Sequence, residues 1–384
     1  MMMAYLDHNA TTPLCQEARD AMLPLLGEGW GNPSGVHASG RRARAVIDES
    51  RDRIASLLGA RPGEIIFTSG GTESCNLAIL GLARRHRSAE RCHLVTAASE
   101  HHAVLHPMRH LAAVEGFTLT EVPVDSRGVI DPERFAEALR PGTLLASVML
   151  ANNETGVIQP VAELSALCRE RGILFHTDAV QAFGKIRCAP AEHGVDAFSA
   201  TAHKFYGPHG AGFLWIRSGT QVAPIVHGGF HENDRRAGTE NTPAIAGMAA
   251  AAERAVSEVI AGKEAERQAD LRERLWEGIR RLRPDAIRNA SGAPVIANTL
   301  NVSFPGCDGE TLLMGLDLEG IAVSSGSACM VGAVQPSHVL MAMGLGEDKA
   351  RPTVRFSLGR GTTAEEIQAT MTALTNVLSL QSAG

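Results

Sequence analysis

Short apolar runs alternate with longer amphipathic segments through residues 64–217. Seven of these runs have the length and composition of β-strands: residues 64–68, 93–97, 119–124, 144–150, 173–177, 197–200 and 212–216. Most are separated by segments with a helical pattern, as in sheets whose parallel strands are joined by helices. The link between the last two runs is short, so we expect the last strand to be antiparallel. The pattern predicts an α/β fold with a mostly parallel seven-stranded sheet.

A different pattern follows in the last third of the chain, where residues 244–282 form a helical tract. Four apolar residues share one stripe of its second half: Leu271, Leu275, Ile279 and Leu282. Beyond the tract lie two strand-like runs and a Ser/Gly-rich stretch between them: residues 298–304, 354–358 and 324–332. We expect a large domain at residues 15–260, and a smaller α+β domain formed by residues 1–14 and 261–384.

The overall composition narrows the classes of function. The 384 residues carry a formal net charge of -6, which gives no support to the basic surface that nucleic-acid binding requires. Seven scattered cysteines do not form the pattern of a disulfide framework, and this favours a reducing compartment such as the cytoplasm. No window approaches the roughly 18 consecutive apolar residues of a membrane span. We therefore expect a cytoplasmic protein that binds neither nucleic acid nor membranes.

Lys204 stands just after the sixth expected strand and is followed by a Gly-Pro turn at residues 207–208. Most lysines are solvated surface charges. Open α/β sheets, however, place their ligands at the carboxyl ends of strands, and the turn would hold this lysine in position. These two features favour a lysine that forms a Schiff base with a carbonyl compound, a role that also requires a lowered pKa.

Asp178 falls at the C-terminal end of the expected strand at residues 173–177. Taken alone, an aspartate in this position is best explained as the N-cap of a following helix. Lys204 comes 26 positions later, after another strand. That spacing favours the alternative, in which the Asp178 carboxylate pairs with the pyridinium nitrogen of a cofactor.

Residues 68–74 (TSGGTES) connect an expected strand to a helical segment. Glycines let the backbone approach an anion, free N–H groups at a helix start attract it, and Thr72 adds a hydroxyl. The same residues fit a capping box, which is compatible with anion binding. Because neither a Walker P-loop nor a GxGxxG motif is present, a single phosphate is favoured over ATP or NAD.

Two further segments carry side chains that could react. His101 and His102 follow the expected strand at residues 93–97, where they could be structural or acid–base groups. The chain has no CxxC, HExxH or comparable zinc pattern, so we expect no metal site.

Cys329 lies amid small polar residues, unlike the other six cysteines. A buried structural cysteine is the usual alternative, whereas these surroundings favour an exposed thiol, which reacts only if its pKa is lowered.

Taken together, these segments resemble the cysteine desulfurases of the NifS/IscS type, which are fold-type I pyridoxal-phosphate enzymes. The similarity extends over nearly the whole chain. Further matching motifs are residues 5–12 (YLDHNATT), 31–34 (GNPS), 152–156 (NNETG), 236–241 (RAGTEN), 336–340 (PSHVL) and 354–359 (VRFSLG). So many correctly spaced matches are more specific than any single motif.

The resemblance implies pyridoxal 5'-phosphate as cofactor and a role for each candidate residue. Lys204 would bind the cofactor covalently, Asp178 would pair with its pyridinium nitrogen, and His101 would stack on its ring and move protons. Asn153 and Gln181 would bind near the phenolic oxygen of the ring.

The remaining implied roles concern the phosphate, the substrate and the sulfur. The residues implied to hold the cofactor phosphate are Gly71, Thr72, Thr201, His203 and, from the other subunit of a homodimer, Thr239. Arg355 and Asn32 would bind the carboxylate of L-cysteine. Cys329 would take the substrate sulfur as a persulfide, leaving L-alanine, and pass it to an iron–sulfur scaffold or another acceptor protein.

The sequence also departs from the common family pattern at several positions. Cys75 replaces the usual Asn, Thr201 a usual Ser, and His209 a usual Lys. Met330-Val331 follows Cys329 where Thr-Ser is common, which leaves the acceptor open and favours a link to nitrogenase.

Other functions stay open at this point. A selenocysteine lyase or an aminotransferase would share the fold and the cofactor, but an aminotransferase would not need Cys329. An inactive scaffold that binds sulfur acceptors is disfavoured by the intact set of Lys204, Asp178 and His101. A nucleotide-binding oxidoreductase is disfavoured because the dinucleotide motif is missing.

Overall fold

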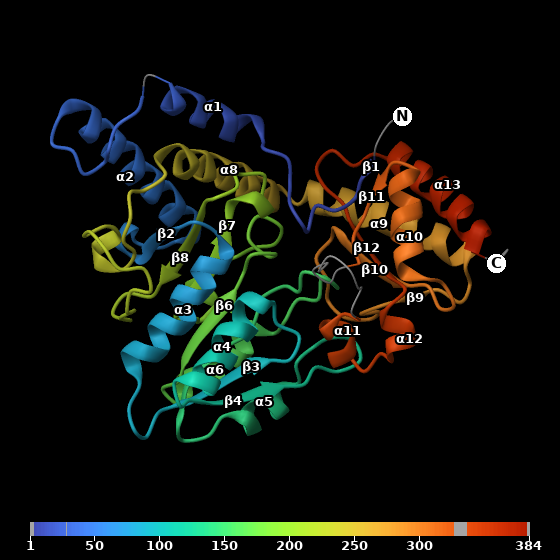
Figure 1. The fold of residues 1–384 in the computed structure, drawn as a ribbon, viewed down its shortest axis with the longest axis horizontal. Helices are drawn as coiled ribbons and strands as arrows, with labels where there is room; N and C mark the ends of the chain where they lie inside the picture. The colour runs from blue at the N-terminus through green and yellow to red at the C-terminus, as the bar shows by residue number, and fades with distance from the viewer. Residues whose placement is uncertain (1–3, 28, 326–335, 382–384) are drawn as a thin grey trace.

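The computed structural model describes residues 4–27, 29–325 and 336–381, which form two lobes joined by long helices (Figure 1). The larger lobe contains one seven-stranded sheet. Its strands, in spatial order, are β2 (Ile65–Thr68), β8 (Gly212–Ile216), β7 (Ala197–Thr201), β6 (Leu174–Asp178), β5 (Thr143–Ser147), β3 (His93–Ala97) and β4 (Thr118–Val122). All neighbours pair in parallel except β8, which is antiparallel to both β2 and β7. The predicted mostly parallel sheet with an antiparallel last strand is confirmed.

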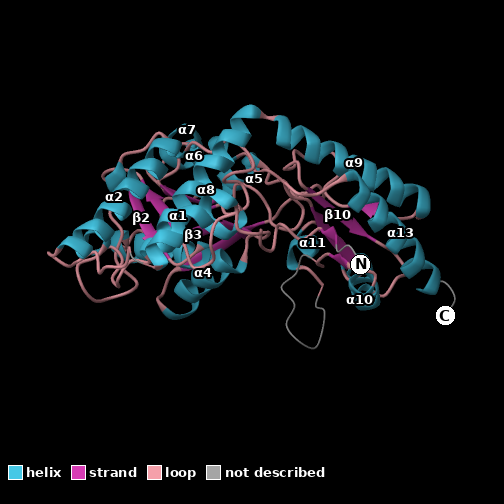
Figure 2. Cartoon of the chain, turned by 90° about the horizontal axis from the view of Figure 1, so that it is seen from above, coloured by secondary structure: helices cyan, strands magenta, loops and turns pink. Residues whose placement is uncertain are grey.

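Helices cover both faces of this sheet, because side chains of successive strand residues point to opposite sides. Leu94 packs in the core beneath one set of helices, whereas Val95, the next residue, packs in the core on the other face. The first face carries α3 (Gly71–His86) and α4 (His102–Val114). The second carries α2 (Ala38–Leu58), α5 (Pro132–Ala138), α6 (Val161–Glu170) and α8 (Thr242–Ala261), with α1 (Gln16–Leu26) packed on α8. Figure 2 shows the strands enclosed between the helices.

Shorter elements complete the larger lobe. A one-turn helix, α7, spans Pro190–His193, and 3₁₀ turns span Pro62–Glu64, Ala202–Lys204 and Glu232–Asp234. The expected helical tract at residues 244–282 is two helices, α8 and α9 (Lys263–Leu282), because Gly262 separates them with a φ of 73° that favours glycine. None of the described helices combines the length and apolar character that crossing a membrane requires.

The smaller lobe has its own core, which includes residues from both ends of the chain. Its strands are β1 (Ala4–Tyr5), β9 (Ile287–Arg288), β10 (Thr299–Ser303), β11 (Ile321–Ala322) and β12 (Thr353–Ser357). Its other helices are α10 (Gly309–Leu318), α11 (His338–Ala342), α12 (Glu347–Ala350) and α13 (Ala364–Gln381). Leu6 is buried with Leu275, Ile279 and Phe356 in this core. Val339 and Leu340 of α11, however, pack in the core of the larger lobe. The division into residues 15–260 and residues 1–14 with 261–384 stays a prediction.

Candidate functional site

A cavity of about 750 Å³ lies where the carboxyl ends of the parallel strands meet the smaller lobe. Open α/β sheets bind ligands at this edge, and the volume suits a cofactor with a small substrate. Ten of the predicted site residues line the cavity together: Gly71, Thr72, His101, Asn153, Asp178, Gln181, Thr201, His203, Lys204 and Arg355. The sequence therefore located the wall of this cavity, although it could not show the cavity itself.

Lys204 enters the cavity from the 3₁₀ turn that follows β7. Its Nζ donates hydrogen bonds to the backbone carbonyls of Asn9, at 2.5 Å, and Ala10, at 2.6 Å. Burial, reinforced by the positive charge of Arg355, lowers the pKa of Lys204 to about 8, although the nearby carboxylates oppose this shift. A much larger fraction of this amine than of an ordinary lysine is therefore in its neutral, nucleophilic form near physiological pH.

The backbone just after Lys204 is held in an uncommon conformation. Tyr206 has a φ of 68°, a value that residues with a side chain rarely adopt. The strain is balanced by partners on both sides: its backbone N–H donates to Thr12 at 2.8 Å, and its hydroxyl accepts from the Arg360 backbone N–H at 2.7 Å. This turn fixes the chain direction at the lysine.

Asp178 is the last residue of β6, and its side chain is buried at the cavity. No helix follows it directly, and its Oδ1 accepts from the Val180 backbone N–H at 2.9 Å within a turn. The helix-cap alternative therefore does not apply here. Burial raises the pKa of the Asp178 carboxyl, while hydrogen bonds from Val180 and Cys75 and the charge of Lys204 oppose the rise. Cys75 is fully buried, and its own thiol pKa is raised well above the usual value by burial.

His101 caps the start of α4, with Nδ1 accepting from the Ala103 backbone N–H at 3.0 Å. That bond places the proton of the neutral ring on Nε2. His101 is exposed at the cavity, while the surrounding protein partly desolvates its ring. This desolvation, together with the charge of Lys204, lowers the pKa of His101 to about 4. The imidazole is thus neutral, with Nε2–H available to a ligand.

The loop between β2 and α3 brings a helix start to the cavity, as expected. Gly71 and Thr72 are the first two residues of α3 and both line the cavity. A Cβ on Gly71 would stand 2.7 Å from Cγ2 of Val180, so only glycine fits without movement. Glu73 also accepts from the Ser69 N–H at 2.7 Å, so a cap and an anion-binding helix start occur together.

Arg355 reaches the cavity from β12 of the smaller lobe. Its Nη1 donates to the Asn153 carbonyl at 3.0 Å and its Nη2 to Asp7 at 2.6 Å. Among the described residues, Nε of Arg355 has no partner although it is buried, and the same holds for the side-chain oxygen Oδ1 of Asn153. Buried polar atoms are rarely left without a partner, so both atoms indicate that a polar ligand belongs in this cavity.

Two predicted residues, Asn32 and Thr239, are not brought to the cavity by this chain, and a third is not described. Cys329 lies outside the described residues, but Ser324 and Pro336, on either side of that segment, both line the cavity. Asn32 is exposed in the link between α1 and α2, where its Oδ1 accepts from the Ser34 N–H. Thr239 is exposed just before α8. Their roles stay predictions.

The segment that follows the undescribed residues is tied to the larger lobe by histidines. His338, at the start of α11, stacks on His102 with ring centroids 4.7 Å apart, and its Nε2 lies 2.8 Å from the Glu100 carbonyl. His106 also stacks on His102, with ring centroids 4.6 Å apart. Among the described residues, no group of three or more His, Cys, Asp or Glu side chains has an arrangement that could hold a metal.

Two residues of the site had no role in the sequence-based prediction. Asn9 supplies the carbonyl that holds Lys204, and its side chain bonds to both lobes, through Thr299 at 2.8 Å and the Asn153 carbonyl at 3.2 Å. Lys185 lies beside it and is partly buried. Asn9 belongs to a motif that supported the family resemblance, which is the signal that could have located it.

Comparisons with known proteins agree with this geometry. The family model described as "Aminotransferase class-V" matches residues 4–370. The cysteine desulfurase IscS of Dictyoglomus turgidum is 46% identical over 374 residues, which cover 97% of this chain and 94% of that protein. A solved structure described as "NIFS-LIKE PROTEIN" superposes with a TM-score of 0.91 at 37% identity, covering 99% of this chain and 100% of the other.

A second solved structure, "SspA in complex with cysteine", superposes with a TM-score of 0.80 at 34% identity, covering 92% of this chain and 98% of that one. These matches extend over nearly the full length of each protein, so the similarity includes both lobes and the cavity between them. The chain belongs to the aminotransferase class-V family and, within it, to the cysteine desulfurases.

Proposed function

We propose that this chain is a pyridoxal-phosphate-dependent cysteine desulfurase, which converts L-cysteine to L-alanine and transfers the sulfur to Cys329. The observation that carries the proposal is the position of Lys204. Its amine, with a pKa lowered to about 8, shares one cavity with Asp178, His101 and Arg355. Family membership and the structural relative described as a complex with cysteine support the same reaction.

The lining of the cavity fits the cofactor. The α3 start at Gly71 and Thr72 suits its phosphate, since that turn offers backbone N–H groups and a hydroxyl. Thr201 and His203 lie on the same wall. Asp178 suits a protonated ring nitrogen, and the unpartnered Oδ1 of Asn153 is explained by a ligand that donates to it. Bound pyridoxal phosphate would supply an electron sink for the charge left when the substrate loses its α-proton.

Lys204 would move the α-proton of the reaction, and His101 would assist it. Lys204 is held by the carbonyls of Asn9 and Ala10, so its nitrogen stays at the cavity when it is not bonded to the cofactor. In its neutral form it can accept the α-proton and return it later. His101 is neutral at neutral pH because its pKa is low, so its Nε2–H would take part through a hydrogen bond to the reacting group.

Arg355 would bind the substrate carboxylate, because its guanidinium is buried at the cavity and its Nε lacks a protein partner among the described residues. Asn32 is proposed as a second ligand of this carboxylate. It lies away from the cavity within this chain, as does Thr239, so both roles require a second copy. We therefore propose a homodimer in which Thr239 reaches the phosphate of the neighbouring subunit.

Cys329 would be the sulfur acceptor. Its thiolate attacks the substrate sulfur, so an S–S bond forms as the C–S bond breaks, and the electron pair of that bond stays on the substrate carbon, which is then protonated to give alanine. A free cysteine is only a few per cent ionised at neutral pH, with a pKa of about 8.5, so nearby positive groups must favour the thiolate. Arg355 would do so, because it lines the cavity that Ser324 and Pro336 also border.

The further destination of the sulfur is inferred from the names of the relatives. We propose transfer to an iron–sulfur scaffold or a similar acceptor protein in the cytoplasm, with nitrogenase maturation as one destination. Incubation of the holoenzyme with purified candidate acceptors and labelled L-cysteine would identify which one receives sulfur.

The reaction is tested by incubating the reconstituted chain with L-cysteine and a reductant while sulfide and alanine are measured together. The wild-type protein should form both in equal amounts. Cys329→Ala should lower both by at least about 100-fold. Cys92→Ala, at a cysteine remote from the cavity lining, should behave as the wild type. Alanine formed by Cys329→Ala at the wild-type rate would remove Cys329 from the mechanism.

A further inference from the structure

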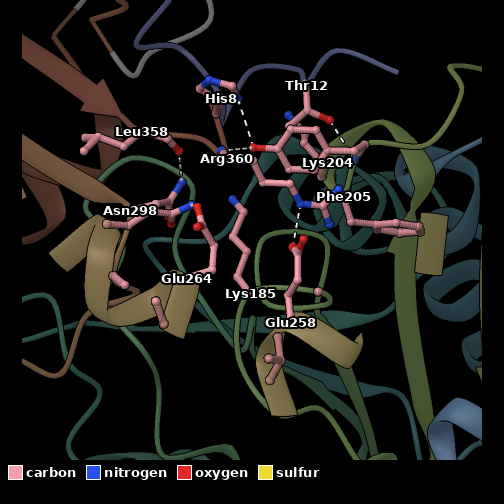
Figure 3. A pocket seen from close by; sticks show the side chains of 16 residues that line it. His8, Thr12, Lys185, Lys204, Phe205, Glu258, Glu264, Asn298, Leu358 and Arg360 are labelled. Carbon is pink, nitrogen blue, oxygen red and sulfur yellow. Dashed lines mark hydrogen bonds and ion pairs between the residues drawn. The ribbon is translucent and has the colours of Figure 1, made fainter. Parts of the chain in front are cut away.

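The turn after β6 partly buries a second lysine, Lys185, beside the proposed active site. The chain has four lysines: Lys185, Lys204, Lys263 and Lys349. The first two both line the small pocket drawn in Figure 3, together with Asn298 of the smaller lobe. Lys204 also lines the larger cavity, so the two spaces adjoin at this residue. Lys263 and Lys349 are exposed. The reaction described above gives Lys185 no role.

Neutral oxygen atoms surround the amine of Lys185. Its Nζ donates to the side-chain oxygen of Asn9 at 2.9 Å and to Oε1 of Gln181 at 2.6 Å. Burial lowers the pKa of Lys185 well below its usual value, and the charges of Lys204 and Arg355 add to this effect. Both oxygen atoms accept N–H groups of this amine. Lys185 is therefore a donor held in a fixed place.

These contacts determine the orientation of the Gln181 side-chain amide. Its Oε1 accepts from Lys185, and its Nε2 donates to the Asn9 carbonyl at 2.8 Å. The reversed amide would place Oε1 against the Asn9 carbonyl, and two acceptors facing each other are unfavourable. In the observed orientation, the second hydrogen of Nε2 remains for a group inside the larger cavity, which Gln181 lines.

The same contacts connect Lys185 to the Schiff-base lysine. The Asn9 carbonyl that accepts from Gln181 also accepts from Lys204 at 2.5 Å. The side-chain oxygen of Asn9 that accepts from Lys185 also accepts from Asn298 at 3.0 Å. One buried network therefore holds Gln181, Asn9 and Lys204 together.

We propose that Lys185 is a positioning residue, which fixes the Gln181 amide so that an N–H is presented to an anionic ring oxygen of the cofactor. The inference rests on the proposed function, because that oxygen belongs to pyridoxal phosphate. Donation to an anionic oxygen stabilises its deprotonated form. Loss of the fixed N–H therefore raises the pH at which the bound cofactor takes up a proton.

The test is a pH titration of the visible absorbance of the holoenzyme. In Lys185→Met, which has a similar length but no donor, the midpoint should rise by about one pH unit. Lys185→Gln keeps an N–H donor and should restore most of the wild-type midpoint. Lys349→Met, at an exposed lysine, is the matched control and should titrate as the wild type. If Lys185→Met holds too little cofactor to titrate, Lys185→Leu is measured in its place with the same expectation.

A double variant decides whether Lys185 acts through Gln181. Gln181→Ala should raise the midpoint by at least as much as Lys185→Met, and adding Lys185→Met to it should cause no further rise. An unchanged midpoint in the Lys185 variant, or a shift that adds to that of Gln181→Ala, would overturn the inference. If the wild-type chain binds no pyridoxal phosphate at all, the proposed function itself fails. A coloured wild type with unaffected Lys185 variants leaves that function standing and removes only this inference.

Discussion

The two walls of the cavity are built in different ways. On the larger lobe, Asp178 and Thr201 end strands β6 and β7, and Lys204 follows three residues later. These groups are positioned by the sheet itself. On the other wall, the side chain of Arg355 is held by a hydrogen bond to Asp7, which is 348 positions away in the sequence. The side chain of Asn9 is held by a hydrogen bond to the Asn153 carbonyl, which is 144 positions away.

This difference determines how each wall should respond to change. A group at a strand end keeps its place as long as the sheet is folded. The groups of the second wall hold one another through buried hydrogen bonds between distant segments, so the loss of one partner leaves other buried polar groups unsatisfied. Substitutions in the second wall should therefore affect residues beyond the one replaced.

The largest effect should come from Arg355→Lys. An ammonium cannot donate in the fixed planar geometry that reaches Asp7, the Asn153 carbonyl and a substrate carboxylate together. We expect kcat/KM for L-cysteine to fall by about 10- to 100-fold, mainly through KM. Arg351→Lys alters an exposed pair with Glu347 and should leave both constants unchanged. If the KM of Arg355→Lys for L-cysteine equals that of the wild type, this wall does not bind the substrate.

An intermediate effect is expected on the first wall from Gly71→Ala. The added Cβ would lie 2.7 Å from Cγ2 of Val180, so the start of α3 must shift. We expect a loss of about 1–3 kcal/mol in unfolding free energy and weaker cofactor binding, both measurable on the purified protein. Val180→Ala in the same chain should relieve the contact and recover most of the loss. Gly63→Ala, where a Cβ meets nothing within 4 Å, provides the control.

The smallest effect is expected from Asp7→Asn, which tests whether a charge on the second wall changes the pKa of Lys204 on the first. Asp7 favours the charged form of Lys204, and its own partner Arg355 disfavours it. Replacement by Asn removes the favourable charge and leaves the unfavourable one, so the pKa of Lys204 should fall below the value of about 8. Only the neutral amine reacts with an aldehyde, so in Asp7→Asn the rate of cofactor uptake by the apoprotein should reach its plateau at a lower pH. Asp20→Asn, at an exposed site, should show the wild-type profile, and an upward shift in Asp7→Asn would contradict the assignment.

The sequence predicted the first wall well, because its determinants are local. The runs at residues 93–97 and 212–216 coincide with β3 and β8. The expected strand at residues 144–150 was too long at its end, since β5 stops at Ser147 and the next residues lead to the cavity rim. The helical tract was expected to be continuous, but a single glycine in the left-handed region, Gly262, divides it.

The second wall was predicted less completely, for a physical reason. Lys185 looks like an ordinary turn lysine in sequence, and its burial depends on Asn9, which is 176 positions away. No local pattern contains that contact. Arg355 was found only because a family motif surrounds it. Thr239 was expected to act from the other subunit, but the position of Asn32 outside the cavity was not foreseen.

The parallel pairing of β1 with β11 also has a consequence for biosynthesis. Ala4 lies opposite Ile321, so 317 residues must be translated between one partner and the other. At about 5–20 residues per second, the ribosome needs roughly 15–60 s for that stretch. During this interval the large sheet can form, but for most of it the hydrogen-bond partners of Asn9 on β10 and β12 have not yet been synthesised. Cofactor capture should therefore be a late event, which follows completion of the chain rather than accompanying it.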